Sequence, residues 1–246
     1  MRKYIAGIFL ITIILASIGI TAYGYAKFNS ILISSPDFVQ EKYIVIKFPN
    51  STYVVLSQNE YIEARLKGWK PPEGSIGYII TLSYNPKSPP DFVLEKRYEE
   101  FTIVVGSPEV KTCSKNPDEF KGSCTERTLA VSEVTLLVST LFKRYFYAEA
   151  IARGLSNESA KMYAYEETMK RRNIRYLSLL VKAQVGLGLI GNEKHLGVII
   201  MGPAEGANET SIIIPREGLI ILKGKSDSSL RAEAILLENL VGLQFS

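Results

Sequence analysis

The chain has 246 residues, of which 46% are hydrophobic and 22% are charged, a balance that is typical of a folded protein and excludes extensive disorder. Its formal net charge is +4, and two of the positive charges, Arg2 and Lys3, precede the first apolar segment. The rest of the chain is close to neutral, so there is no electrostatic argument for a nucleic-acid partner.

The first predicted element is an uncharged segment from Tyr4 to Ala26, which we expect to be a transmembrane helix. As a helix, its 23 residues reach about 34 Å, enough to cross a hydrocarbon core of ~30 Å. Two basic residues precede the segment and only Lys27 follows it closely. The positive-inside rule therefore predicts a cytoplasmic tip at residues 1–3 and a body outside the cell.

Two other interpretations of this segment remain open. A cleaved signal peptide would use the small residues within Ala22–Ala26 as its cleavage site, although a secretory apolar region is usually only about 7–15 residues long. A buried helix of a soluble protein would rarely be apolar on every face over this length. The anchor and the signal peptide both place the body outside the cytoplasm.

A short stalk at residues 27–40 is expected to lead into a β-rich region at residues 41–125. The region opens with a predicted hairpin from Tyr43 to Leu56, in which β-branched and aromatic residues flank a Pro-Asn turn. The other elements predicted there are a short helix at 59–69, a strand at 76–84 and one or two strands within 91–110.

The two cysteines, Cys113 and Cys124, enclose a polar loop with Asn-Pro and Lys-Gly turn signals. The ten residues between them fit a disulfide but not the Cys-x-x-Cys spacing of zinc and redox motifs. A bridge that closes this loop would stabilise the chain by about 2–3 kcal/mol. We expect a disulfide, with two free thiols as the alternative.

Beyond the cysteine loop the apolar spacing becomes helical, and residues 126–190 are predicted to form a long antiparallel helical hairpin. Gly154 ends its first helix, and the second is predicted to run from the Ser-Asn-Glu-Ser cap at 156–159 to about Val185. The C-terminal unit, residues 191–246, is predicted to contain strands at 196–201, 211–215 and 219–223 and a helix from about Ser228.

The predicted fold class is therefore α+β. It combines an N-terminal transmembrane helix, a β-rich region, a long helical hairpin, and a C-terminal β-hairpin and strand with an amphipathic helix.

Closely spaced glycines from Gly202 to Gly224, followed by Lys-Ser, raise the question of a nucleotide-binding loop. Such a loop needs Gly-x4-Gly-Lys-Ser/Thr between a strand and a helix. Here Gly218 and Gly224 are separated by five residues, and those five are themselves predicted to be a strand. The spacing and the context both exclude a phosphate-binding loop.

No other motif carries a definite chemistry, and we assign no catalytic, cofactor-binding or metal-binding residue. His195 is the only histidine, so a zinc site built from several histidines cannot form within one chain. We interpret it as a loop residue and not as the general base of a Ser-His-Asp triad. Glycoside chemistry needs two carboxylates that face each other across a cleft. The carboxylates considered for this role are Glu149, Glu166, Glu167 and Glu205.

Three Asn-x-Ser/Thr sequons begin at Asn50, Asn157 and Asn208. Each lies in a predicted turn or helix start, where a glycosylation acceptor would be exposed. Because Asn and Ser are common in turns for conformational reasons as well, these sites are candidates only.

The stretch from Gly197 to Gly242 contains a Gly-Pro-x-Glu-Gly turn, a strand that ends in Pro, a glycine-flanked apolar strand and a helix. In these features it resembles a module of uncharacterised membrane-anchored surface proteins of hyperthermophilic archaea. The resemblance implies a cell-surface location and an archaeal source, and it carries over no catalytic or binding residue. The low Gln and His content likewise favours a thermophilic source.

We therefore expect a single-pass membrane protein whose extracellular body is a non-catalytic binding or assembly module of the cell envelope. Its partners would be the membrane and other envelope proteins or glycans, and the body would be secreted if the N-terminal segment were cleaved. One alternative is an envelope hydrolase or transferase that uses carboxylate and tyrosine side chains in a deep cleft. Another is a subunit of a larger membrane complex, for which an exposed apolar patch on the helical hairpin would be the sign.

Overall fold

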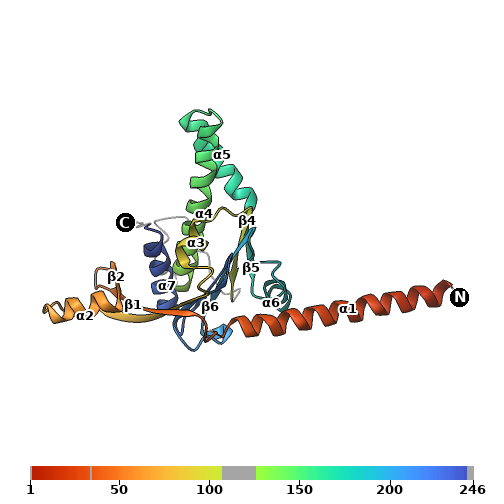
Figure 1. Cartoon of the computed structure of the whole chain (residues 1–246), viewed down its shortest axis with the longest axis horizontal. Coiled ribbons are helices and arrows are strands. Elements are labelled where there is room, and N and C mark those ends of the chain that lie inside the picture. The colour runs from red at the N-terminus through yellow and green to blue at the C-terminus, as the bar shows by residue number, and fades with distance from the viewer. Residues whose placement is uncertain (1, 34, 107–125, 243–246) are drawn as a thin grey trace, which may run out of the picture.

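The chain folds around one mixed β-sheet and belongs to the α+β class that the sequence predicts (Figure 1). The structure is a computed structural model that describes residues 2–33, 35–106 and 126–242. Cys113 and Cys124 lie outside these residues, so their disulfide stays a prediction.

The helices of the described residues are α1 (Arg2–Ile31), α2 (Gln58–Leu66), α3 (Pro90–Glu95), α4 (Glu126–Ala152), α5 (Asn157–Arg171), α6 (Leu179–Gly186) and α7 (Asp227–Leu240). The strands are β1 (Val39–Lys47), β2 (Tyr53–Ser57), β3 (Ile76–Tyr84), β4 (Glu100–Val105), β5 (Arg172–Tyr176), β6 (His195–Met201), β7 (Ser211–Arg216) and β8 (Leu219–Lys223). Within the sheet they lie in the order β2-β1-β3-β7-β8-β6-β4-β5.

The sheet has an antiparallel half and a parallel half. β2, β1 and β3 are antiparallel neighbours, whereas β8, β6, β4 and β5 run parallel. β7 joins the halves, because it is parallel to β3, with Leu82 opposite Ile212, and antiparallel to β8. The β-rich region and the C-terminal unit, which the sequence predicts as separate regions, therefore share one sheet.

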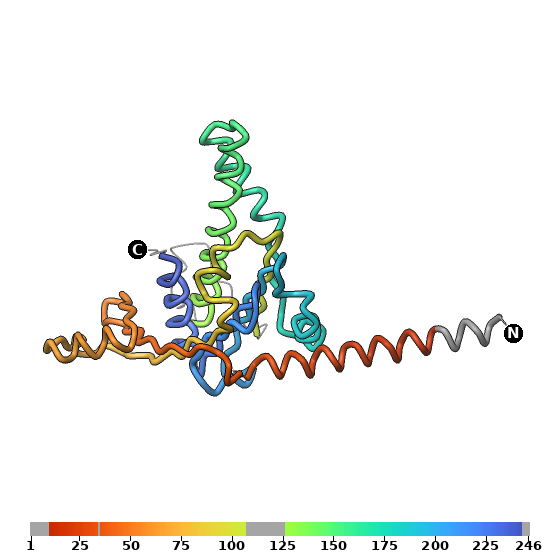
Figure 2. The backbone as a smooth tube through the Cα atoms, in the orientation of Figure 1, coloured from red at the N-terminus to blue at the C-terminus, as the bar shows by residue number. Residues whose placement is uncertain are grey.

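Helices cover both faces of the parallel half (Figures 1 and 2). Ile103 of β4 faces the core formed with α4 and α7, whereas Val104 faces a second core formed with α6 and the end of α1. Strands that are buried on both faces are apolar at almost every position, which accounts for the uninterrupted runs of β6 and β8.

α4 and α5 form a helical hairpin that projects from the body, to the side of the line of α1 (Figure 1). Its turn places Gly154 at φ 83°, and Oγ of Ser156 accepts a hydrogen bond from the Ser159 amide at 3.3 Å to cap α5.

The second helix of the hairpin is shorter than predicted. It ends at Arg171 instead of near Val185, because residues 172–176 pair with β4 as the edge strand β5, and α6 then forms a separate helix. Pairing with the sheet outweighs the helical spacing of the apolar residues in this stretch.

One further prediction differs from the structure. Residues 27–40 are not a stalk, because α1 continues to Ile31, the Phe28 side chain is fully buried in the second core, and β1 begins at Val39. No stalk therefore separates the exposed apolar part of α1 from the part of the same helix that is buried in the second core. Within the described part of residues 91–110, the structure has one strand, β4, as predicted, and it is preceded by α3, with Pro90 at its first helical position.

Candidate functional site

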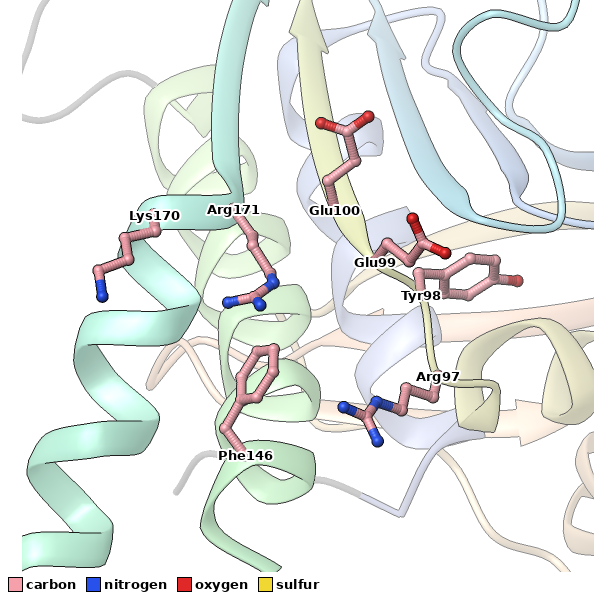
Figure 3. A pocket seen from close by; sticks show the side chains of 7 residues that line it. All are labelled: Arg97, Tyr98, Glu99, Glu100, Phe146, Lys170 and Arg171. Atoms are coloured by element: carbon pink, nitrogen blue, oxygen red, sulfur yellow. The ribbon is translucent and has the colours of Figure 1, made fainter. Parts of the chain in front are cut away.

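One cavity lies where the connection into β4 faces the helical hairpin (Figure 3). Its volume is about 760 Å³. It is lined by Arg97, Tyr98, Glu99, Glu100, Phe146, Lys170 and Arg171. The lining thus mixes three cations and two carboxylates with the aromatic rings of Tyr98 and Phe146.

The cations of this cavity already have partners. The Arg171 Cζ lies 4.6 Å from the centroid of the buried Phe146 ring, and the Arg97 Cζ lies 5.9 Å from it, which are cation–π distances. Arg97 also donates to Glu149 at 2.6 Å, and Lys170 donates to Glu167 at 2.8 Å. Hydrogen bonds from Lys170 and Arg171 lower the pKa of Glu167 to about 2, so this carboxylate is ionised and unsuited to act as a general acid.

His195 lies beside this cavity and is held on both sides. It is the buried first residue of β6, which corrects its interpretation as a loop residue. Nδ1 lies 3.1 Å from Oε1 of Glu100, and Nε2 lies 2.7 Å from Oγ1 of Thr102. Burial lowers the pKa of His195, the charge of Glu100 opposes this shift, and Nε2 shares a hydrogen bond with the Thr102 hydroxyl.

The four carboxylates considered for catalysis do not converge. Glu149 is held by Arg97 and Arg153, and Glu167 by Lys170 and Arg171. Glu166 is exposed on α5, and Glu205 lies at the opposite end of the parallel strands. Within the described residues, these four glutamates form no pair of free carboxylates across a cleft.

An ion-pair cluster closes the carboxyl ends of β4 and β6, the edge at which open α/β sheets usually bind ligands. Nη2 of Arg127, at the start of α4, donates to Oε2 of Glu205 at 3.0 Å, and its Nε donates to Oδ1 of Asp227 at 3.1 Å. The same Glu205 oxygen accepts from the Gly202 amide at 2.7 Å. Oε2 of Glu205 is thus engaged by both Arg127 and the Gly202 amide.

The Gly-Lys-Ser run lies beside this cluster without forming a phosphate cradle. The five residues between Gly218 and Gly224 are β8, and Gly218 turns at the other end of that strand with φ 76°. Ser226 caps α7, with its Oγ accepting from the Ser229 amide at 3.1 Å. The exclusion of a nucleotide-binding loop is therefore consistent with the position of β8.

A second hollow lies between α4 and α5 on the hairpin. Its volume is about 500 Å³. It is lined by Thr140, Lys143, Arg144, Tyr147, Lys161, Ala164 and Tyr165. We call this the hairpin groove. No carboxylate is among its lining residues, and Lys143 Nζ lies 5.3 Å from the centroid of the Tyr165 ring. Three cations with two tyrosines suit an anionic ligand that also offers apolar surface.

The most apolar surface of the described chain belongs to α1. Its segment Leu10–Ile31 is long and apolar enough to cross a membrane, with a mean hydropathy of 1.4, and only 6% of it is buried. Near its end, α1 packs closely against α6. A Cβ added to Gly24 would lie 2.6 Å from the carbonyl oxygen of Ala183, and one added to Gly186 would overlap the carbonyl oxygen of Gly24.

α6 is a separate helix, whereas the sequence predicts that its residues continue the helical hairpin. Large apolar side chains remain exposed on and around it, namely Ile174, Tyr176, Leu179, Leu180, Leu187 and Leu189. The available signal was the nearly uninterrupted apolar run from Leu177 to Ile190, which contains a single charge. The helical spacing led us to include this run in the hairpin instead.

The three glycosylation candidates are all exposed. Asn50 lies in the turn after β1, Asn157 begins α5, and Asn208 follows the 3₁₀ turn at Pro203–Glu205. Their accessibility is compatible with modification, which stays a prediction.

Comparisons of the chain with protein-family models, with curated proteins and with solved structures found no match. The resemblance to archaeal surface proteins therefore stays a prediction, and the function is argued from the geometry.

Proposed function

We propose that the chain is a single-pass membrane protein of the cell envelope, with its N-terminus in the cytoplasm and its body outside. The body acts as a non-catalytic binding or assembly module. The observation that carries this proposal is the exposed apolar surface of α1, which extends away from the body along most of its length (Figure 2).

The exposed apolar side chains of α1 would be costly to leave in water. Leu10, Ile11, Leu15 and Ile18 each expose about half of their side chain or more, and apolar surface left in water costs about 25 cal/mol per Å². A soluble helix would bury one face against the body, but only the end of α1 does so. A bilayer supplies the missing apolar environment around the whole helix.

The ends of α1 support the orientation. Arg2 and Lys3 precede the apolar part, whereas Tyr23 and Tyr25 lie near the body, with Lys27 Nζ 5.8 Å from the Tyr23 ring centroid. Tyrosines are typical of membrane–water interfaces, and an excess of basic residues is typical of the cytoplasmic side. This pattern favours a body on the outer face.

The hairpin groove is the binding face that we assign to the module. It lies on the part of the body that projects to the side of α1, where a neighbouring envelope component has access (Figure 1). Its cations and tyrosines favour an acidic glycan or an acidic protein surface over a neutral partner.

Labelling of intact cells with a membrane-impermeant amine reagent tests the topology. Lys67 and Lys194 are exposed on the body and are expected to react before lysis, whereas Lys3 is expected to react only afterwards. Retention of the full-length chain in membranes after an alkaline wash tests the anchor. Protection of Lys67 and Lys194 until lysis, or release of the chain by the wash, would contradict the proposal.

A further inference from the structure

We propose that α6 is a second membrane contact, whose exposed leucines insert into the outer leaflet beside α1 and hold the body against the membrane surface. This inference rests on the proposed function, because α1 sets the depth at which α6 lies.

The packing of the two helices brings α6 to the level of the apolar part of α1. The Gly24–Gly186 crossing leaves no room for a side chain at either glycine. Beyond it, Leu179 lines a shared hollow of about 470 Å³. The α1 residues that line this hollow are Ser17, Ile18, Thr21, Ala22 and Tyr25. The N-terminal end of α6 therefore lies alongside a segment that the anchor places in lipid.

The depth of α6 follows from the helix rise. Phe28 is buried in the body, so the lipid-exposed part of α1 ends before it. Ile18 to Ala22 precede Tyr25 by three to seven residues, or roughly 5–10 Å along the axis. An interfacial helix buries its apolar face about 5–10 Å into the boundary between headgroups and acyl chains. Leu179 thus lies at the depth expected for such a helix.

The two sides of α6 differ in what covers them. Val181, Ala183 and Val185 are buried against the sheet and α1. On the other side, Leu179 and Leu180 expose 58% and 59% of their surface, and Leu187 and Leu189 beyond the helix are also exposed. Since this side continues the lipid-facing surface of α1, the same bilayer is the occupant that we assign to it.

The only charged residue of α6 fits the same position. Lys182 Nζ lies 5.8 Å from the ring centroids of Tyr25 and Phe28, at the end of α1 that enters the body. A lysine at this level can bury its stem along apolar surface while its ammonium group reaches lipid phosphates. α6 contains no carboxylate that would oppose the approach to a phosphate layer.

Tryptophan quenching in the full chain tests the inference. In a Trp69→Phe background, which removes the only native tryptophan, single variants Leu179→Trp and Leu180→Trp are reconstituted into phosphatidylcholine vesicles whose acyl chains are brominated near the headgroups. Ile18→Trp reports on the anchor itself. Leu66→Trp is the matched control, because Leu66 is a leucine that is 83% exposed on α2.

Emission from Leu179→Trp and Leu180→Trp is expected to fall about twofold relative to unbrominated vesicles, as expected for side chains within the lipid boundary, with Leu66→Trp unchanged. Quenching of Ile18→Trp without quenching at either α6 position would overturn the inference and leave the anchor standing. That outcome includes a blue-shifted but unquenched α6 tryptophan, which would indicate a protein partner or a second copy on this surface. Absence of quenching at Ile18 as well would overturn both proposals.

Discussion

Nη2 of Arg127 lies 3.0 Å from Oε2 of Glu205, although 77 residues separate the two in the sequence. Their side chains are only 12% and 9% exposed. The pair crosses the ends of β4 and β6, where Gly106 and Gly202 lack the side chains that would collide with it. It ties the start of α4 to the loop between β6 and β7.

Removal of one partner of this pair is expected to destabilise the body strongly. Glu205→Gln leaves the Arg127 guanidinium buried without its shielded counter-ion, at a cost of about 3 kcal/mol of the free energy of unfolding. The measurement is denaturant unfolding of the full chain in detergent. The control Glu63→Gln breaks an exposed pair with Lys67 and is expected to cost less than about 0.5 kcal/mol. Equal effects of the two variants would contradict the importance of burial.

The two glycines beside the pair are expected to resist substitution. A Cβ at Gly106 would overlap the Glu205 carboxylate, and one at Gly202 would overlap the Arg127 guanidinium, so each Ala variant should lose about 1–3 kcal/mol of the free energy of unfolding. Gly77→Ala on β3 is the control, because a Cβ there meets no atom within 4 Å. If Gly106→Ala and Gly202→Ala unfold like the Gly77→Ala control, the Arg127–Glu205 pair adjusts to the added methyl groups without strain.

Stability is expected to depend on pH through Glu238. Burial, together with the charge of Glu133 on α4, raises the pKa of Glu238 from its usual 4.5 to about 7, and Arg231 opposes this shift. Because the folded state holds this proton more tightly than the unfolded state, the stabilisation is present below about pH 4.5 and is lost as the pH rises to about 7. A shift of this size corresponds to at most about 3 kcal/mol.

The variant Glu238→Gln is expected to flatten this part of the stability–pH curve. Part of the slope should persist, because the fully buried Glu233 also has a pKa well above its usual value. The measurement is the unfolding midpoint between pH 4.5 and 7. Unchanged slopes in the Glu238→Gln protein would assign the pH dependence to other groups.

The hairpin groove is expected to bind acidic ligands through its cations. The double variant Lys143→Glu and Lys161→Glu reverses two of its charges and should weaken binding to a carboxylated polysaccharide about tenfold, since about 1.4 kcal/mol corresponds to that factor. Salt-dependent retention on a polysaccharide resin measures the effect. Lys67→Glu with Lys70→Glu changes the net charge equally in the segment that follows α2, outside the groove. An equal loss of binding in both double variants would show that binding depends on net charge and not on the hairpin groove.

The sequence predicts the individual elements better than it predicts their partners. β3 and β8 occupy the predicted residues, because short runs rich in Ile and other apolar or aromatic residues between turn residues indicate strands locally. The sequence does not predict the position of β8 between β7 and β6, because strand pairing is a property of the assembled sheet. The same applies to β5, whose residues form a strand only because β4 offers an edge.

In the candidate site as well, the sequence identifies single residues but not the partners they contact. The sequence identifies His195 as the only histidine, but its contacts with Glu100 and Thr102 depend on the pairing of two neighbouring strands. Glu205 was recognised as a carboxylate, but its engagement by Arg127 joins distant parts of the chain. Contacts of this kind leave no pattern in a single sequence.

The sequence by itself determined the apolar N-terminal helix and the α+β class, because hydropathy and periodicity are local properties of the chain. Only the tertiary structure decided that the end of this helix belongs to the core, that one sheet unites the two β-regions, and that α6 packs against α1 at Gly24. These features arise when distant segments compete to bury the same apolar surface, and that competition is settled only in the folded protein.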